Sequence, residues 1–338
     1  MFWSDALSIL KVLTFKRCLN VFKLAFSFSL AKSFKIISPF GMPYAASIEP
    51  TTACNLGCPE CPSGLKSFTR PTGRLSLENN ESILKNLGKQ LFYINYYFQG
   101  EPFLHPQFLE LIKAAKRYNI YTATSTNAHF ITEKKAFDIV ESGLDRLIIS
   151  IDGLTQETYE QYRVHGKLEK VIEGTKHIIS AKKKLKSRTP HVIFQFLVVA
   201  PNEHEIPQVF ELAKELEVDE VRLKTAQLYD YKNGNPLMPK NEKYARYKRA
   251  KDGTYKPKYK IENHCWRMWS SLVVTWNGNV VPCCFDKDAK YVLGDITNSP
   301  LTKTWKSKEY QGFRKGVFTN RKEIDICANC SEGTKVWT

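Results

Sequence analysis

The feature that most constrains the fold is a regular alternation of strand-like and helix-like segments that begins near residue 46. Short apolar runs recur along the chain, and segments with apolar residues at helical spacing lie between them. Parallel strands can become neighbours only through such crossover segments, so the alternation predicts an α/β fold, either a barrel or an open doubly wound sheet. The expected strands are residues 46–48, 92–98, 121–125, 146–151, 192–199 and 220–223, and the expected helices are 77–87, 106–118, 132–142, 167–184 and 206–216.

Three cysteines follow the first expected strand at CxxxCxxC spacing, in the segment PTTACNLGCPECP: Cys54, Cys58 and Cys61. In β/α folds, the loops at the carboxyl ends of the strands carry the active site. Three thiolates can hold three irons of a cubane cluster and leave the fourth iron open to a small molecule. Zinc is the alternative, but it prefers a fourth protein ligand, and none is adjacent in the sequence.

The chain has nine cysteines in 338 residues, most of them in groups. Disulfide frameworks are typical of much smaller secreted chains, whereas grouped CxxC spacing favours metal binding in a reducing compartment. We therefore expect a cytoplasmic location.

Three later segments follow the cysteine motif in order, and together they resemble the radical S-adenosylmethionine (SAM) superfamily. They are YFQGEPFLHP after the second strand, TSTNA at the third, and SIDG with YEQYRVHG after the fourth. Singly, each has an ordinary explanation as a turn or a helix cap. The resemblance implies a partial (β/α)6 TIM-like barrel and a [4Fe-4S] cluster on Cys54, Cys58 and Cys61. It also implies SAM contacts from Gly100, Glu101, Pro102, Ser125, Asn127, Ser150 and Arg163, although Gln99 stands where the family more often has glycine.

The resemblance also implies a reaction. SAM would be cleaved reductively to methionine and a 5′-deoxyadenosyl radical, which removes hydrogen from an unactivated carbon, while the protein positions and shields the reactants. The electron would come from a reductant such as flavodoxin or ferredoxin. No catalytic acid or base is predicted.

The C-terminal part contains four further spaced thiols: Cys265, Cys283, Cys327 and Cys330. The stretch VVTWNGNVVPCCFD predicts a hairpin that turns at Asn277 and Gly278. This part resembles the small α+β SPASM/twitch domains, which implies a second [4Fe-4S] cluster on these four thiols, suited to electron transfer. A zinc ribbon on the same thiols, with His264, is the alternative. Cys284 is either a ligand in place of Cys283 or a small buried apolar residue.

Residues 1–40 contain one acid, Asp5, while basic residues are spread among aromatic ones. The basic residues interrupt each apolar stretch before it reaches the roughly eighteen residues that a membrane span requires. The order of charges is also wrong for a secretory signal. We expect one or two amphipathic helices that either lie on an anionic membrane or cap the barrel with their aromatic side. Cys18 would lie on the membrane side or in the core, and deletion of residues 1–35 would release the protein from anionic vesicles while leaving SAM cleavage intact.

The predicted units are N-terminal helices at 1–45, a radical SAM core at 46–229, a basic linker at 230–262 and an auxiliary-cluster domain at 263–338. The formal net charge of +16 favours anionic partners without naming one.

The predicted function is dehydrogenation of a small-molecule, sugar or lipid-linked substrate, with the auxiliary cluster accepting an electron. A peptide or protein maturase is the alternative. An RNA-modifying enzyme using the basic stretch 240–260 is less favoured, because charge runs are usually solvated faces, and a non-catalytic zinc or iron–sulfur protein is the least favoured. The expected location is the cytoplasm, either free or bound peripherally to the inner face of the membrane.

Overall fold

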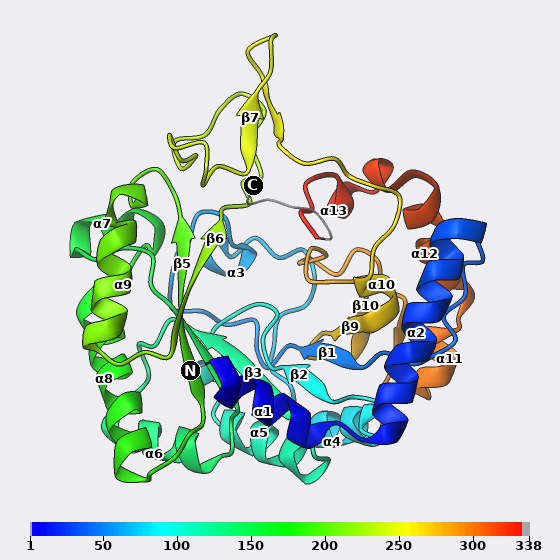
Figure 1. The fold of residues 1–338 in the computed structure, drawn as a ribbon, viewed down its shortest axis with the longest axis horizontal. Coiled ribbons are helices and arrows are strands. Elements are labelled where there is room, and N and C mark those ends of the chain that lie inside the picture. The colour runs from blue at the N-terminus through cyan, green and yellow to red at the C-terminus, as the bar shows by residue number, and fades with distance from the viewer. Residues whose placement is uncertain (1, 333–338) are drawn as a thin grey trace.

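A single mixed sheet forms the centre of the molecule (Figure 1). The computed structural model describes residues 2–332, with side chains from residue 5 onward, and within this part nine strands pair in the order β11-β10-β9-β1-β2-β3-β4-β5-β6. The strands from β1 to β6 are all parallel, as the alternation predicted. They are β1 (Ala45–Ile48), β2 (Tyr93–Asn95), β3 (Tyr121–Thr126), β4 (Arg146–Ser150), β5 (His191–Val198) and β6 (Glu220–Thr225). The α/β barrel-type fold expected from the sequence is confirmed.

Helices cover the outer face of these strands (Figure 1). Each of the five predicted helices is present within two residues of its expected ends, and a further helix, α7 (Gln156–Tyr162), was not predicted. Several helices begin where a hydroxyl side chain accepts a hydrogen bond from a backbone N–H three residues on, as Ser76, Thr132 and Thr155 do. The predicted helices are α4 (Leu77–Leu87), α5 (Phe108–Arg117), α6 (Glu133–Glu141), α8 (Leu168–Lys184) and α9 (Ile206–Glu215).

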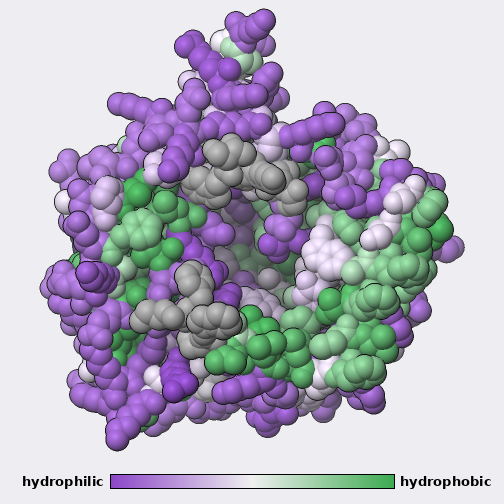
Figure 2. All heavy atoms as spheres, in the orientation of Figure 1, coloured by the Kyte–Doolittle hydropathy of each residue, from purple (hydrophilic) through white to green (hydrophobic). Residues whose placement is uncertain are grey.

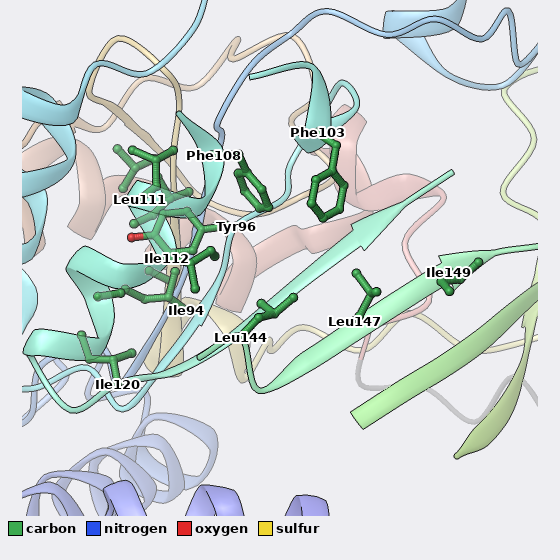
Figure 3. Packing of buried hydrophobic residues seen from close by; sticks show 14 of the residues in the cluster. Ile94, Tyr96, Phe103, Phe108, Leu111, Ile112, Ile120, Leu144, Leu147 and Ile149 are labelled. Carbon is green, nitrogen blue, oxygen red and sulfur yellow. The ribbon is translucent and has the colours of Figure 1, made fainter. Parts of the chain in front are cut away.

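The main core lies between these helices and the sheet. Figure 3 shows Phe108 of α5 next to Phe103 and Tyr96, and the Phe108 ring packs edge to face with each of the other two rings. Leu147 and Ile149 of β4 contribute to the same cluster and are fully buried. Burying each such side chain contributes about 1.5–3 kcal/mol, so this layer supplies much of the stability that holds the strand ends in place.

The C-terminal unit extends the barrel sheet instead of forming a sheet of its own. β9 (Ser271–Val274) pairs in parallel with β1, and β10 (Asn279–Val281) returns antiparallel to it. The predicted hairpin is confirmed, with Gly278 at φ +90° in its turn. Its buried apolar strand covers an edge of β1 that would otherwise expose unpaired backbone groups. The rest of this unit comprises β11 (Gly294–Asp295), α10 (Arg267–Ser270), α11 (Leu301–Trp305), α12 (Lys308–Asn320) and α13 (Asp325–Ala328).

The segment predicted as a linker contains an ordered hairpin of β7 (Tyr247–Arg249) and β8 (Tyr255–Pro257), which projects from the molecule (Figure 1). Its base is anchored by Tyr247, which is buried and stacks on Tyr231 with 4.4 Å between ring centroids. The Tyr247 hydroxyl also donates to Asn329 Oδ1 at 2.9 Å. The segment therefore contacts the C-terminal unit directly.

Two helices precede the barrel, as expected: α1 (Phe2–Val12) and α2 (Phe15–Phe34). The buried guanidinium of Arg17 donates to the carbonyls of Gly88, Tyr118 and Asn119, which lie just after α4 and α5. Helix C-termini leave such carbonyls without partners and carry partial negative charge, so Arg17 ties α2 to the base of the barrel. Between residues 2 and 332, none of the helices combines the length and apolar character needed to cross a bilayer.

Candidate active site

A cavity of about 210 Å³ lies at the carboxyl ends of the parallel strands. It collects side chains from the loop after β1, from the ends of β2 to β5 and from the turn after α7. Nine residues that the sequence singled out line it: Cys54, Cys58, Cys61, Gly100, Glu101, Ser125, Asn127, Ser150 and Arg163. Pro102 does not; it is buried at the start of a short 3-10 helix, Pro102–Leu104, where its fixed φ favours the turn.

The three thiols are held in the cysteine loop, residues 50–62, which is closely packed. A Cβ added to Gly64 would lie 2.5 Å from the backbone nitrogen of Cys58, so only glycine lets the short helix α3 (Pro62–Leu65) approach the loop. The backbone nitrogen of Gly57 donates to the carbonyl of Val164 at 2.9 Å, which joins the loop to the segment after α7.

Burial raises the pKa of two of these thiols, Cys54 and Cys58. It raises the pKa of Cys54 to about 12, and it raises the pKa of Cys58 against the opposing effect of Arg163. Such thiols stay protonated until a metal displaces the proton. Three thiols and no fourth line this cavity, a donor set that suits a cubane cluster with one open iron. Within the described chain, no group of three or more Cys, His, Asp or Glu side chains is arranged to hold a single metal ion.

Glu101 and Gly100 form the cavity wall after β2. Gly100 has φ +74°, and an added Cβ would lie 2.3 Å from the carbonyl oxygen of Thr51. Glu101 is buried and accepts from Thr126 Oγ1 at 2.7 Å and from the backbone nitrogens of Asn127 and Phe103 at 2.8 and 3.2 Å. A carboxylate offers about four acceptor positions, so one remains for a ligand donor such as an ammonium group.

Three polar side chains from neighbouring strands complete the wall. Ser125 lies on β3, Ser150 ends β4, and both line the cavity. Asn127 also lines the cavity, and within the protein its Nδ2 donates to Asn55 Oδ1 at 2.8 Å and its Oδ1 accepts from the backbone nitrogen of His129. Asn127 therefore also anchors the cysteine loop.

Arg163 joins the thiols to the end of β4. Its Nη1 donates to Cys58 Sγ at 3.7 Å, and its Nε forms an ion pair with Asp152. Burial alone would lower the pKa of Arg163, but Asp152 and Cys58 raise it well above its ordinary value. The second carboxylate oxygen of Asp152 accepts from the backbone nitrogen of Leu197 at 2.6 Å. Asp152 thus fixes the guanidinium between the thiols and β5.

Sequence reasoning missed the role of Asp152 and several cavity residues, among them Gln195 and Lys287. Asp152 stands within the SIDG segment, so its position beside Ser150 was the available signal. Gln195 lies among apolar residues on β5, where an isolated polar residue in a buried strand is a usable sign. Lys287 comes from the C-terminal unit, and nothing local marks it.

A larger pocket of about 590 Å³, called here the outer pocket, adjoins the cavity. It is lined by parts of residues 62–67, 227–232, 285–290 and 325–329. Lys287 lines both spaces, and its Nζ donates to the hydroxyl of Tyr229 at 2.8 Å. The outer pocket therefore lies between the core and the C-terminal unit, next to the thiol cavity.

The C-terminal thiols form a second group, in which Cys327 and Cys330 are buried and Cys265 and Cys283 are half-buried. Burial raises the pKa of Cys283 well above its ordinary value, and Cys284, Cys330 and Cys265 add to the effect, so these thiols lie near one another. Burial also raises the pKa of Cys327 to about 11, and Cys265 contributes to this increase. Arg321 Nη2 donates to Cys330 Sγ at 3.4 Å, a contact that parallels Arg163 with Cys58.

The remaining two cysteines differ in their surroundings. Cys284 is half-buried, packs against Phe98, Val273 and Val281, and lies close enough to Cys283 to raise the pKa of that thiol. Cys18 is exposed on α2, so it is not a core thiol.

The barrel and its three-thiol cavity define an enzyme built to hold an iron–sulfur cluster with an open position. A family profile described as the radical SAM superfamily matches residues 48–221, just over half of the chain, and one described as an iron–sulfur cluster-binding domain, SPASM, matches residues 265–331. The chain belongs to the radical SAM superfamily and carries a C-terminal SPASM domain. Its cofactors are accordingly a [4Fe-4S] cluster with SAM in the core and auxiliary iron–sulfur binding in the SPASM domain.

Curated relatives cover most of the chain at low identity. A PqqA peptide cyclase of Gluconobacter oxydans is 26% identical over 71% of this chain and 70% of its own length. A protein of Pyrococcus furiosus described as a tungsten-containing aldehyde ferredoxin oxidoreductase cofactor-modifying protein is 25% identical over 84% of this chain and 86% of its own.

Solved structures share the fold. BtrN in complex with AdoMet and 2-DOIA has a TM-score of 0.53 at 19% identity, covering 86% of this chain and 94% of its own. The structure of anSMEcpe with bound AdoMet has a TM-score of 0.63 at 20% identity, and the match covers 84% of this chain and 83% of anSMEcpe. Streptococcus suis SuiB bound to the precursor peptide SuiA has a TM-score of 0.60 at 14% identity, and the match covers 86% of this chain and 70% of SuiB.

Proposed function

We propose that this radical SAM enzyme dehydrogenates a polar small molecule, a sugar or a lipid-linked substrate held in the outer pocket. The observation that carries the proposal is the shared wall at Lys287: a substrate in the outer pocket would lie next to the cavity where SAM is expected. A pocket of about 590 Å³ is within the usual range of about 300–1,000 Å³ for small-molecule sites.

The lining of the outer pocket supports a hydroxyl-bearing substrate. Tyr229, Tyr231 and Phe285 offer aromatic faces, and charged groups of both signs stand between them. Two of the acids are already used by the fold, since Asp286 accepts from the backbone nitrogens of Lys290 and Tyr291 and Asp288 accepts from that of Thr69. Lys287 and the tyrosine hydroxyls are the groups best placed to orient a substrate.

The residues of the chain have separable tasks in this proposal. Cys54, Cys58 and Cys61 would hold the SAM-binding cluster, and Cys265, Cys283, Cys327 and Cys330 an auxiliary one. When bound, these groups supply reductive SAM cleavage to a 5′-deoxyadenosyl radical and acceptance of an electron from the substrate. Glu101 would bind the SAM amino group, Arg163 would keep positive charge beside the thiols, and the buried walls would exclude water. Because thiols must stay reduced to ligate iron, we place the reaction in the cytoplasm.

Electron entry is proposed at a second opening beside Cys54. A pocket of about 580 Å³ is also lined by this thiol, and Lys66 and Arg74, both exposed, are part of its lining. A basic lining suits an acidic electron carrier of the flavodoxin or ferredoxin class.

Deuterium transfer tests the proposed function. The protein is reconstituted with iron and sulfide without oxygen, supplied with SAM and dithionite, and offered a panel of fully deuterated sugars, cyclitols and sugar lipids. The expected result is 5′-deoxyadenosine that carries deuterium from one of them. Lys287→Met should lose this transfer and keep substrate-independent SAM cleavage, whereas Lys303→Met, an exposed lysine on α11, should keep both.

A peptide substrate is the second candidate, favoured by the printed names of the relatives: a PqqA peptide cyclase and SuiB with its precursor peptide. If deuterium comes from labelled peptides and from none of the sugars or cyclitols, the small-molecule proposal is wrong and the peptide one is correct. Absence of any 5′-deoxyadenosine would contradict both.

A further inference from the structure

The outward face of α2 carries large apolar side chains where a surface helix normally has polar ones. Phe15, Leu19, Phe22 and Phe26 are separated by four, three and four residues, which places them on one face of the helix. Their exposed fractions are 83%, 41%, 67% and 52%. Figure 2 shows apolar residues gathered over α2 and the end of α1 on this side of the molecule.

The opposite face of the same helix is already in use. Leu24, Ser27 and Ala31 are buried against the C-terminal unit, and Trp269 Nε1 donates to Ser27 Oγ at 3.2 Å. The helix therefore has two apolar faces. Packing against the C-terminal unit explains the inner one and leaves the outward one exposed. The outward face is extended by Phe40, which is 50% exposed and whose ring lies 6.2 Å from that of Phe26. These five residues are called the aromatic face.

The charged residues of α2 beside the aromatic face are all basic. Lys16 and Lys23 on α2 are exposed on one flank, and Lys32 is exposed on the other. Asp5, the one acid among residues 5–40, is buried against Tyr121 and Arg146 and adds no exposed negative charge. The surface thus combines exposed aromatic rings with a rim of lysines.

We propose that the aromatic face docks the protein on the surface of an anionic lipid bilayer. Aromatic and leucine side chains enter the boundary between headgroups and acyl chains, and lysines beside them pair with anionic headgroups. The helix would lie in the plane of the surface, because its other face is fixed to the protein. The proposal does not depend on the reaction, since docking needs neither SAM nor substrate.

A second copy of this chain fits the aromatic face less well. A symmetric contact through this face would bring the lysine rims of two copies together, and like charges facing each other disfavour association. Anionic headgroups meet the same rim with attraction.

The deletion expected from the sequence is a poor test, because residues 1–35 include Arg17, Leu24 and Ser27, which hold the fold together. Point changes on the outward side avoid this. In flotation with phosphatidylcholine vesicles that contain about one third phosphatidylglycerol, the intact holoenzyme should bind. Binding should weaken with added salt and be much lower on pure phosphatidylcholine.

Two variants separate the contributions. Phe22→Ser with Phe26→Ser should weaken vesicle binding at least about tenfold, since each buried ring contributes about a factor of ten. Lys16→Gln with Lys23→Gln should reduce the preference for anionic vesicles. The matched control is Phe210→Ser on α9, whose phenylalanine is 48% exposed but lies off this face, and it should bind as the unaltered protein does.

Three results would overturn the proposal. The first is failure of the unaltered protein to float with anionic vesicles. The second is equal binding by the double phenylalanine variant. The third is a vesicle-free dimer, seen by light scattering, that the double phenylalanine variant abolishes, because a second copy would then be the occupant of this face.

Discussion

Glu101 is the side chain at which the proposed SAM site should respond to pH. Burial raises its pKa to about 6, against the hydrogen bonds from Asn127, Thr126 and Phe103. Below that pH the carboxyl is neutral and attracts an ammonium group weakly, so SAM affinity should fall by up to about tenfold for each pH unit below about 6. Calorimetric titration of SAM into the reconstituted protein across this range measures the effect.

The control is Glu101→Gln, which should bind SAM weakly with no dependence on pH in this range. Because the pKa of Glu101 is raised from 4.5 to about 6 in the folded protein, ionisation of Glu101 lowers the stability of the protein as the pH rises through this range. Glu101→Gln does not have this loss, so a large drop in its melting temperature near neutral pH would show that the variant is damaged. A pH dependence that persists in Glu101→Gln would assign it to another group.

Asp152 should act through Arg163 and not on the ligand. Its side chain is fully buried, so Asp152→Asn leaves the guanidinium without its countercharge and should lower the free energy of unfolding by about 3 kcal/mol. Urea denaturation measures this loss. Glu173→Gln, which breaks the exposed pair with Lys170, should change nothing measurable, and an equal loss there would contradict the argument.

At the scale of elements, the turn after β2 sets the shape of the cavity. Gly100→Ala would place a Cβ 2.3 Å from the Thr51 carbonyl in a left-handed backbone conformation, so the turn must move away from the cysteine loop. We expect loss of SAM binding and a fall in the unfolding free energy of at least about 1–2 kcal/mol. Calorimetry and urea denaturation measure the two effects.

Gly312 provides the matched change on α12. An added Cβ there meets nothing within 4 Å in the middle of a helix. Gly312→Ala should therefore stabilise the protein by about 0.5–1 kcal/mol and leave SAM binding intact. Similar behaviour of both variants would show that the tight approach at Gly100 is unimportant.

Local sequence patterns predicted elements well and contacts between distant elements poorly. Five of the helices and the six strands of the barrel follow from period and turn residues, and the cysteine and GEP segments fell at strand ends because parallel strands share one edge. The commitment of Asn127 to Asn55, and the pairing of Asp152 with Arg163, depend on how loops from different strands meet. No periodicity encodes such a meeting.

The same limit holds for the whole molecule. Apolar alternation predicted the β9–β10 hairpin, but β9 pairs with β1 because the barrel has an open edge, which is a property of the assembled sheet. Lys287 reaches the cavity for the same reason. The backbone nitrogens of Thr69 and Arg70 donate to Asp288 and hold the segment that carries Lys287 against the core. Two parts of the chain that were predicted as separate domains therefore build one site.

This continuity predicts that the C-terminal unit cannot be removed cleanly. A chain ending at residue 262 would lose β9 and the buried Trp269, and so expose the edge of β1 and the inner face of α2. It should aggregate in size-exclusion chromatography. Replacement of Cys265, Cys283, Cys327 and Cys330 by alanine should instead give a monodisperse protein that loses the auxiliary iron and keeps the iron of the core. A soluble truncated chain that still binds SAM would mean that the barrel closes without β9.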